Sequence, residues 1–353
     1  MNRLSLKAAL FTSVLVTGAS IILLRVTYAV IGLPLTQSIL IALLFPLLLV
    51  ALQPGHKWLE AAEATITRIA GHRIVSVSTV GILAFLISAG LSLIGGIPQP
   101  AVDDEFSYLL AGDTFARGRL TNPTHAMWVH FESIHIIQQP TYASKYPPGQ
   151  GLMLAVGQVI AGQPIVGVWL STGLACAAIC WMLFAWVPAR WALVGGLLIV
   201  FHPIVLGWSQ NYWGGAVAMG GGALVIGAFR RIVRKPRTRD AFLMGVGMAI
   251  LANSRPYEGL VLSLLLSCAL VGWMLSKEGP SLHTSVRHIV LPILMVLLLA
   301  AGGMGFYNKS VTGNPFQMPY MLHEATYSVA PNFLFQDLRP EPNYRQRSFA
   351  RYM

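Results

Sequence analysis

The chain has 353 residues, of which 55% are hydrophobic and only 10% are charged. Soluble globular domains carry about 25% charged residues, so this composition excludes a soluble enzyme and predicts an all-α polytopic membrane protein. The formal net charge is +11, and in a membrane protein such an excess of Lys and Arg is typical of cytoplasmic loops, so no nucleic-acid partner is expected.

The apolar runs predict where the chain crosses the membrane, because a spanning helix needs about 20 mainly apolar residues. Such runs lie near residues 8–30, 35–52, 74–97, 165–187, 191–209, 213–229, 241–253, 259–275 and 289–306. The run 241–253 is short and must borrow flanking residues. The apolar piece 151–162 is too short to cross, and we expect it to dip in from the outside or to lie at the interface.

Basic residues predict which side each connection faces. Residues 230–239 hold six Arg and Lys, which places this connection in the cytoplasm. Counting crossings from a cytoplasmic N-terminus puts the loop 98–148, the connection 253–258 and the tail from residue 307 outside. Nine of the 13 acidic residues then lie outside, so we expect the active site to face outward.

This topology predicts three parts of the chain. Residues 1–73 form a two-span hairpin followed by a cytoplasmic amphipathic segment. Residues 74–306 form the transmembrane core and include the outer loop 98–148. Residues 307–353 form an outer polar tail that ends within polar sequence, as in a fragment or a naturally short form.

The outer loop opens on three adjacent acids, Asp103, Asp104 and Glu105. Phe106, Leu109, Leu110 and Asp113 follow at helical spacing, which predicts an amphipathic helix on the membrane surface. Capping of the helix N-terminus explains one acid well and a second tolerably, but not three in a chain so poor in charge. We interpret Asp103 and Asp104 as a general base, or as ligands of a divalent cation such as Mg or Mn, and Glu105 as a substrate contact.

Two further stretches of this loop carry polar candidates. His125, His130, Glu132 and His135 contain ligand types for zinc, but their spacing matches no known ligand motif, so ordinary loop histidines are the better interpretation. Lys145 and Tyr146 precede a Pro-Pro-Gly turn. We interpret Lys145 as a phosphate-binding cation and Tyr146 as a substrate contact, against the alternative of a snorkelling interfacial lysine.

The other outer segments add weaker candidates. Asn211 lies between aromatic residues that fit a membrane-interface belt, and it has the chemistry to hydrogen-bond a sugar. Arg255, Tyr257 and Glu258 lie around a helix-breaking proline near membrane depth, where charges tend to face a cavity. We interpret Arg255 as a phosphate ligand and the other two as substrate contacts, against an Arg–Glu pair that only caps the turn. In the tail, residues 323–327 form either a lid over the outer site or a simple polar segment.

Several of these motifs, taken in order, resemble a known family. An acidic pair opens the first large outer loop, a surface helix follows, and then come Tyr-Pro-Pro-Gly, Arg-Pro-Tyr-Glu-Gly and Thr-Gly-Asn-Pro. This order resembles the GT-C membrane glycosyltransferases, which include protein O-mannosyltransferases and lipid A aminoarabinose transferases. The resemblance covers roughly residues 75–330.

The resemblance implies a GT-C-like helix bundle in a bacterial inner (plasma) membrane. It implies a polyprenyl-phosphate-sugar donor, and the acceptor would be a lipid, a glycan or a protein. Asp103 or Asp104 would act as the base or orient the acceptor, while Lys145 and Arg255 would bind the donor phosphate. We expect an inverting transfer to an acceptor hydroxyl.

Two other functions remain open on the sequence alone. A secondary transporter or lipid flippase would carry charges in the middle of its spans and often internal repeats. The sequence shows no such repeat, and Arg25, near the end of the first expected span, is the one candidate charge. A catalytically silent membrane scaffold predicts that the acidic cluster is dispensable.

Overall fold

The structure, a computed structural model, describes residues 57–331, 335–340, 342, 344 and 345. The expected spans 8–30 and 35–52 lie outside the described residues. Contacts divide the chain into two compact units, Met1–Arg68 and Ile69–Met353, and helix α3 (Lys57–Gly71) includes the boundary between them.

Five helices in the described part are long and apolar enough to cross a membrane. They are α4 (Arg73–Gly95), α7 (Pro164–Trp186), α10 (Gly215–Arg234), α12 (Pro256–Leu275) and the continuous helix Leu282–Thr312, which comprises α13 (Leu282–Ser285), the π-helical turn η3 (Val286–Val290) and α14 (Leu291–Thr312). These helices match five of the expected spans. The chain is therefore a helical integral membrane protein.

Two of the expected spans take a different form. Residues 191–209 are divided between α8 (Ala189–Val200) and α9 (Pro203–Trp208), because Pro203 lacks the N–H and the space that an uninterrupted helix requires. Residues 241–253 lie in α11 (Thr238–Ala252), whose 15 residues rise about 22 Å at 1.5 Å each, less than a hydrocarbon core of about 30 Å.

The short apolar piece forms α6 (Pro148–Ala161), which is too short to be a candidate span, as predicted. It ends at Gly162, whose φ of 69° is left-handed and suits glycine. Gly157 and Gly167 allow α6 and α7 to approach closely, since an added Cβ on Gly157 would lie 2.2 Å from the Gly167 nitrogen. This close packing fixes the position of α6 and of the turn before it.

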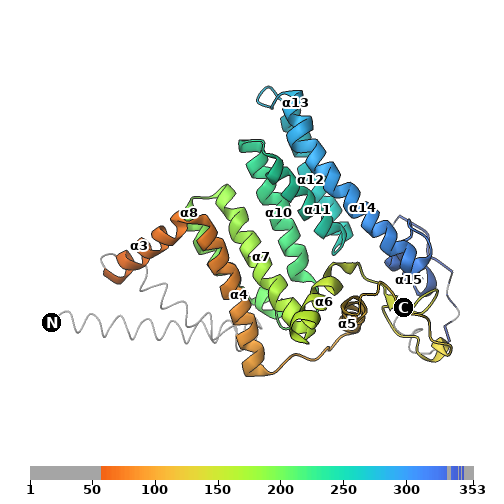
Figure 1. Cartoon of the computed structure of the whole chain (residues 1–353). Coiled ribbons are helices and arrows are strands. Elements are labelled where there is room, and N and C mark those ends of the chain that lie inside the picture. Colours follow the sequence, from red (N-terminus) through yellow and green to blue (C-terminus); the bar gives the residue numbers. More distant parts are fainter. Residues whose placement is uncertain (1–56, 332–334, 341, 343, 346–353) are drawn as a thin grey trace. The chain divides into compact units, whose positions relative to one another are not determined.

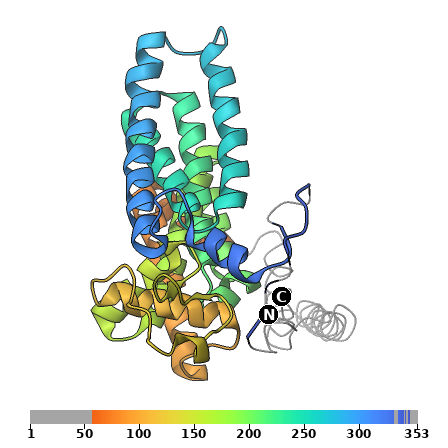
Figure 2. The same cartoon turned by 90° about the vertical axis from the view of Figure 1, so that its right-hand side faces the viewer.

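The helices of this unit form a layer in which α7 contacts α4 on one side and α10 on the other, followed by α11 and α14 (Figure 1). α11 contacts both α12 and α14, and α12 and α14 are joined at the end that carries α13 (Figure 2). A buried cluster between α10, α11, α12 and η3 forms part of the core; it includes Val225, Ile232, Met244 and Ile289. Burial of such side chains contributes most of the stabilisation of the bundle interior.

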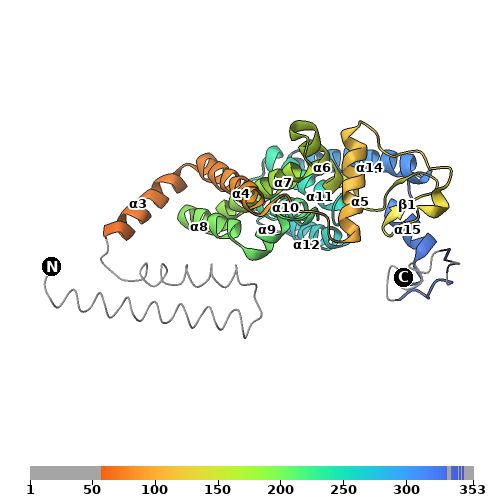
Figure 3. The same ribbon diagram turned by 90° about the horizontal axis from the view of Figure 1, so that it is seen from below.

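One end of the layer carries the elements formed by residues 98–148 and by the tail. These elements are α5 (Asp103–Ala116), the 3₁₀ turn η2 (Trp128–His130), the strands β1 (Ile136–Ile137) and β2 (Ala143–Ser144), and α15 (Pro319–Tyr327). The strands pair antiparallel, with Ile136 opposite Ser144. Seen from below, α5, β1 and α15 lie beside the end of α14 (Figure 3). The helix after the three acids is thus confirmed, while α14 continues to Thr312, beyond the expected start of the tail at residue 307.

Helix α5 buries a different face from the one its apolar residues suggest. Phe106 is 52% exposed, whereas Ser107, Tyr108, Ala111 and Gly112 are buried. Gly112 lies on the α6 side, where an added Cβ would be 2.8 Å from the Leu154 Cβ. The protein-facing side of α5 is therefore built from small and polar residues, and its large apolar residue points outward.

Candidate functional site

The three acids that open α5 point to three different surroundings. Glu105 is 4% exposed, and its carboxylate accepts hydrogen bonds from the backbone N–H groups of Ala101, Val102 and Tyr212 at 2.8, 3.2 and 2.9 Å. Backbone N–H groups of the chain itself therefore engage both oxygens of the Glu105 carboxylate. These hydrogen bonds tie the start of α5 to the turn before α10. We predicted a substrate contact here, and the structure instead gives Glu105 a structural role.

Asp104 is the acid that belongs to a side-chain network. The Tyr146 hydroxyl donates to Asp104 Oδ1, and His135 Nε2 lies 3.3 Å from the same oxygen. The Asp104 side chain is 33% exposed, so it remains accessible. Asp103 is exposed and has no hydrogen bond or ion pair with another described residue. Of the two acids predicted as the base, Asp104 has the surroundings that orient a carboxylate.

The hairpin places both partners of Asp104. Ser107 Oγ on α5 lies 2.7 Å from the His135 carbonyl oxygen and 2.7 Å from Ser144 Oγ, which ties the hairpin to the helix. His135 has a φ of 64°, a left-handed conformation that is uncommon for residues other than glycine and concentrates at functional sites. The Tyr146 ring stacks on the Tyr108 ring at a centroid distance of 4.5 Å.

Lys145 faces away from Asp104 into a buried ion pair. Its Nζ lies 2.9 Å from Glu324 Oε1 on α15, and its side chain is only 5% exposed. His323 Nδ1 lies 3.4 Å from the same Glu324 oxygen. We predicted Lys145 as a free phosphate-binding cation, but Glu324 neutralises it. Its ammonium also lies 5.0 Å from the centre of the Tyr320 ring, a favourable cation–π distance.

Burial and these contacts fix the protonation states of the network. Burial, followed by the nearby Lys145 ammonium, lowers the pKa of His135 to about 4, so His135 is neutral near pH 7. Burial tends to raise the pKa of Glu324, but hydrogen bonds from His323 and Lys145 outweigh it and lower the pKa to about 2. Burial and the hydrogen bond to Asp104 raise the pKa of Tyr146, which therefore remains a donor.

Five of the nine predicted site residues line one cavity of about 260 Å³: Lys145, Tyr146, Arg255, Tyr257 and Glu258. The turn before α6 meets the turn before α12 because Gly149 N–H donates to the Asn253 carbonyl at 2.8 Å. An added Cβ on Gly149 would lie 2.6 Å from that oxygen, so this close approach requires glycine. The two motifs singled out in the sequence thus share one site.

Arg255 supplies the accessible positive charge of this cavity. It is the N-cap residue of α12, it is exposed, and it makes no ion pair with any residue that the structure describes. Glu258, one turn further along, does not pair with it either. The alternative of an Arg–Glu pair that only caps the turn therefore does not describe these residues.

An apolar groove of about 770 Å³ adjoins the polar cavity. The two share four lining residues, Pro148, Asn253, Met304 and Tyr307. The groove walls come from α6, α7, α10, α11 and α14 and include many small residues, among them Ala175, Ala216, Gly220 and Gly303. The charged cavity therefore continues into an apolar groove between membrane-spanning helices.

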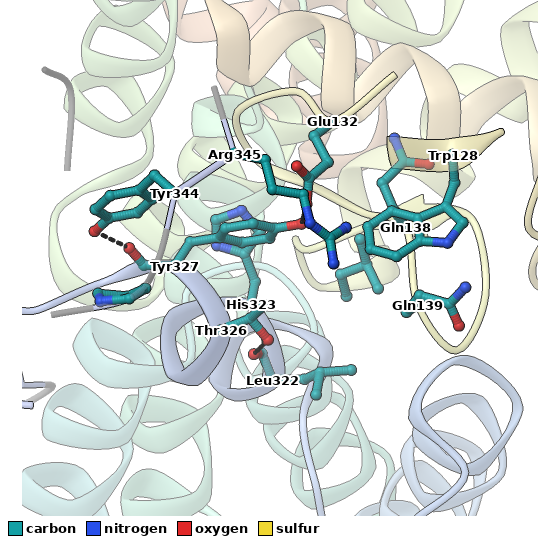
Figure 4. Close-up of a pocket in the computed structure, with 12 residues that line it drawn as sticks. Trp128, Glu132, Gln138, Gln139, Leu322, His323, Thr326, Tyr327, Tyr344 and Arg345 are labelled. Atoms are coloured by element: carbon teal, nitrogen blue, oxygen red, sulfur yellow. Dashed lines mark hydrogen bonds between the residues drawn. The ribbon is translucent and has the colours of Figure 1, made fainter. Parts of the chain in front are cut away.

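A second polar cavity, of about 240 Å³, has His323 in its lining (Figure 4). Its lining includes Trp128, Gln138, Gln139, Tyr327 and Arg345. Figure 4 shows the Arg345 side chain beside Trp128, with the guanidinium carbon 4.8 Å from the centre of the ring. His323 is 1% exposed, and its Nε2 has no hydrogen-bond partner among the described residues.

Two histidine rings lie between Tyr146, which lines the first cavity, and Tyr327, which lines the second; the His135 ring is 5.7 Å from the Tyr146 ring. The rings of His135 and His323 lie 6.1 Å apart, and His323 is also 5.0 Å from the Tyr327 ring. The sequence favoured an ordinary loop histidine for His135, and it left open whether His323 and Glu324 belong to a lid or to a simple polar segment. The available signal was weak: His323 and Glu324 are adjacent in the sequence, but nothing local shows that they meet Lys145 or His135.

The remaining candidates lie elsewhere. Asn211 caps its own turn, accepting from the Trp213 N–H at 2.9 Å and donating to the Gly207 carbonyl at 2.9 Å, and it lines neither polar cavity. Within the described part of the chain, no group of three His, Cys, Asp or Glu side chains is arranged to hold a metal ion.

No protein-family model, curated protein or solved structure matches this chain. The function therefore has to be inferred from the geometry of the site.

Proposed function

We propose that this chain is a GT-C-type membrane glycosyltransferase that transfers a sugar from a polyprenyl-phosphate donor to an acceptor hydroxyl at the outer face of a bacterial plasma membrane. One observation carries the proposal. A carboxylate contacted by Tyr146 and His135 lies beside a cavity that opens into an apolar groove, and this cavity holds Arg255, which has no ion pair with a described residue. A base, a cation for phosphate and a path for a lipid tail are the three parts that this reaction needs.

The groove and Arg255 together match the donor. A polyprenyl chain is apolar along its length, and the groove between α6, α7, α10, α11 and α14 offers it an apolar surface. A guanidinium binds phosphate through paired N–H donors, and Arg255 has no competing ion pair with a described residue. Lys145 is paired with Glu324 and contributes mainly by holding the wall of the cavity.

Asp104 would act as the general base. The hydrogen bond from Tyr146 and the contact with His135 Nε2 both involve Oδ1, which leaves Oδ2 for the acceptor hydroxyl. The acceptor oxygen bonds to the anomeric carbon as the bond from that carbon to the phosphate oxygen breaks, and the hydroxyl proton passes to Asp104. A single displacement of this kind inverts the anomeric carbon. Arg255 stabilises the negative charge on the departing polyprenyl phosphate.

The second cavity is our candidate approach for the acceptor. Aromatic faces and amide groups, such as those of Tyr327, Gln138 and Gln139, are suited to hydroxyl-rich molecules. The cavity meets the network of Asp104 at His323. A lipid, a glycan or a protein side chain would each present the required hydroxyl.

The test is sugar transfer from a synthetic polyprenyl-phosphate sugar by the full chain in detergent. Positioned general bases contribute about 10² to 10⁴ in rate, so we expect Asp104→Asn to lose activity by that factor. Asp113→Asn removes the same charge from the same helix where Asp113 pairs with Arg117 on an exposed face, and we expect less than about a twofold change.

Full activity of Asp104→Asn would overturn the assignment of the base. Movement of lipid across liposome membranes without any transfer product would favour a flippase. If the chain neither transfers sugar nor binds polyprenyl phosphate, the scaffold interpretation holds.

A further inference from the structure

A third cavity, of about 380 Å³, lies at the end of the bundle opposite Asp104. It is formed by the start of α4, the last turns of α10, the start of α11 and the far part of α7, all of which end away from α5 and α6 (Figure 1). Its polar lining residues include Arg73, Arg231, Arg239 and Asp240. The positive-inside rule predicts that this end faces the cytoplasm.

The charges in this cavity are unbalanced. Three guanidinium groups face one carboxylate, which leaves an excess of two positive charges. Asp240 is 2% exposed, and its ion pair is with Arg239 Nε at 3.7 Å, a long contact. Arg73 makes no ion pair with a described residue; its guanidinium lies 5.9 Å from the Phe184 ring centre. An anion is therefore the ligand that this cavity favours.

Arg231 is held in place and is not free to extend toward water. Its Nη1 donates to the Gly227 carbonyl at 2.8 Å and its Nη2 to the Trp181 carbonyl at 2.5 Å. Its guanidinium lies 3.6 Å from the centre of the Trp181 ring. Gly227 makes room for this stack, since an added Cβ would lie 2.5 Å from the indole. An arginine that only snorkels to the interface would not need three such contacts.

The remaining donors of Arg231 are available to a ligand. A guanidinium has five N–H donors, and the two backbone carbonyls use one donor on each of two nitrogens. The walls beside the arginines are apolar and include Ile74, Val77, Phe184 and Leu243. A fixed cation beside apolar walls fits a ligand that joins a phosphate to acyl chains.

We propose that this cavity binds the headgroup phosphate of an anionic phospholipid in the leaflet on that side of the membrane. The cavity lies where spanning helices end, which is the depth of lipid headgroups. Basic pockets between transmembrane helices bind anionic headgroups on the cytoplasmic side. The site is separate from the glycosyltransferase site proposed above, and it does not depend on that function.

The experiment measures lipid retained by the purified full chain in nanodiscs or detergent, by native mass spectrometry. The probes are phosphatidylglycerol, neutral phosphatidylcholine as the control lipid, and inorganic phosphate or glycerol 3-phosphate as soluble anions. The test variant is Arg73→Gln with Arg239→Gln. The matched control is Arg234→Gln with Arg237→Gln, which removes two exposed charges from the same end but outside the cavity.

We expect the wild type to retain phosphatidylglycerol over phosphatidylcholine and the test variant to retain about tenfold less, because charge-assisted hydrogen bonds are lost. The control variant should retain it as the wild type does. Arg231→Lys, which keeps the charge but loses the planar stack, should also weaken retention.

Equal loss in the control and test variants would mean a general attraction to positive charge and would overturn the site. A thermal shift from inorganic phosphate or glycerol 3-phosphate as large as that from phosphatidylglycerol would overturn the lipid as the occupant. Unchanged retention in the test variant, with its elution profile on size exclusion intact, would overturn the proposal as well.

Discussion

The two ends of the helix bundle differ in how their charged side chains are paired. At the end that carries Asp104, the charged side chains have partners within the protein: the Lys145 ammonium contacts the Glu324 carboxylate, and the neutral His135 ring contacts Asp104. At the other end, three arginines surround Asp240 and leave positive charge unmatched within the described residues.

This difference indicates what each end is built to receive. A site for chemistry needs its own groups fixed before the substrate arrives, and paired charges fix them without reorganisation. A site for an anion keeps its cations available until the ligand supplies the partner. Two cations, Lys145 and Arg255, line the first cavity at the Asp104 end, and only Arg255 has no ion pair with a described residue. We therefore assign Arg255 to the donor phosphate.

The largest expected effect on stability comes from removing one member of the buried Lys145–Glu324 pair. Lys145→Met should destabilise the protein by roughly 3–5 kcal/mol, because it leaves the Glu324 carboxylate buried without its cation. The side chains of the pair are 5% and 13% exposed, so water compensates little. Denaturant unfolding in detergent measures the effect.

The double variant Lys145→Met with Glu324→Leu provides the control for this prediction. It removes both charges, and we expect it to recover most of the lost stability, since an apolar replacement of a buried pair is often neutral. A Lys145→Met protein as stable as the wild type would mean that the pair is not buried in solution.

Removing the charge of Glu105, at the same end, should have the next largest effect on stability. Glu105→Gln should destabilise by about 1.5–3 kcal/mol, because three backbone N–H groups lose their charged acceptor. Asp337→Asn, at an exposed position, is the matched control and should change the stability by less than about 0.5 kcal/mol. An equal effect in both variants would count against the structural role of Glu105.

The sequence predicts the spans and the acid-bearing helix well because both depend on local pattern. Apolar length alone located α4, α7, α10, α12 and the helix that includes α14. The expected span 191–209 was wrong in one respect: it overlooked Pro203, at which α9 begins as a separate helix. Local pattern thus carries most of the helical fold.

The site was harder to predict, for physical reasons. Successive helical residues point about 100° apart, so only the fold decides that Asp104 meets Tyr146 while Asp103 faces outward. The Lys145–Glu324 pair joins residues 179 positions apart, and no local pattern encodes such a contact. The left-handed φ of His135 likewise depends on the hairpin and not on the residue type.

Acid should weaken the Asp104 end in a defined window. The folded-state pKa of His135 is about 4, below its ordinary value of 6.5, so the unfolded chain takes up the proton first as the pH falls. Its contribution is complete above about pH 6.5 and is lost toward pH 4. Each group changes the stability by at most about 1.4 kcal/mol per pH unit. Melting temperatures in detergent between pH 7.5 and 4.5 measure this loss.

His135→Asn separates this contribution, because Asn tolerates the left-handed conformation and does not titrate. We expect a flatter melting profile between pH 6.5 and 4.5 in the variant. Glu324, with a pKa of about 2 against an ordinary 4.5, adds a loss only below about pH 4.5. An unchanged profile would assign the acid sensitivity to other groups.

The smallest expected effect on stability is that of Arg239→Gln, at the opposite end of the bundle, and it tests whether the charges there are unpaired. Arg239 is 71% exposed and only 3.7 Å from Asp240, so Arg239→Gln should cost less than about 1 kcal/mol in detergent without anionic lipid. Added phosphatidylglycerol should raise the melting temperature of the wild type more than that of the variant, because the missing cation is then part of the ligand site. If Arg239→Gln instead destabilised the lipid-free protein as strongly as Lys145→Met, charges at this end would be paired for stability like those around Lys145.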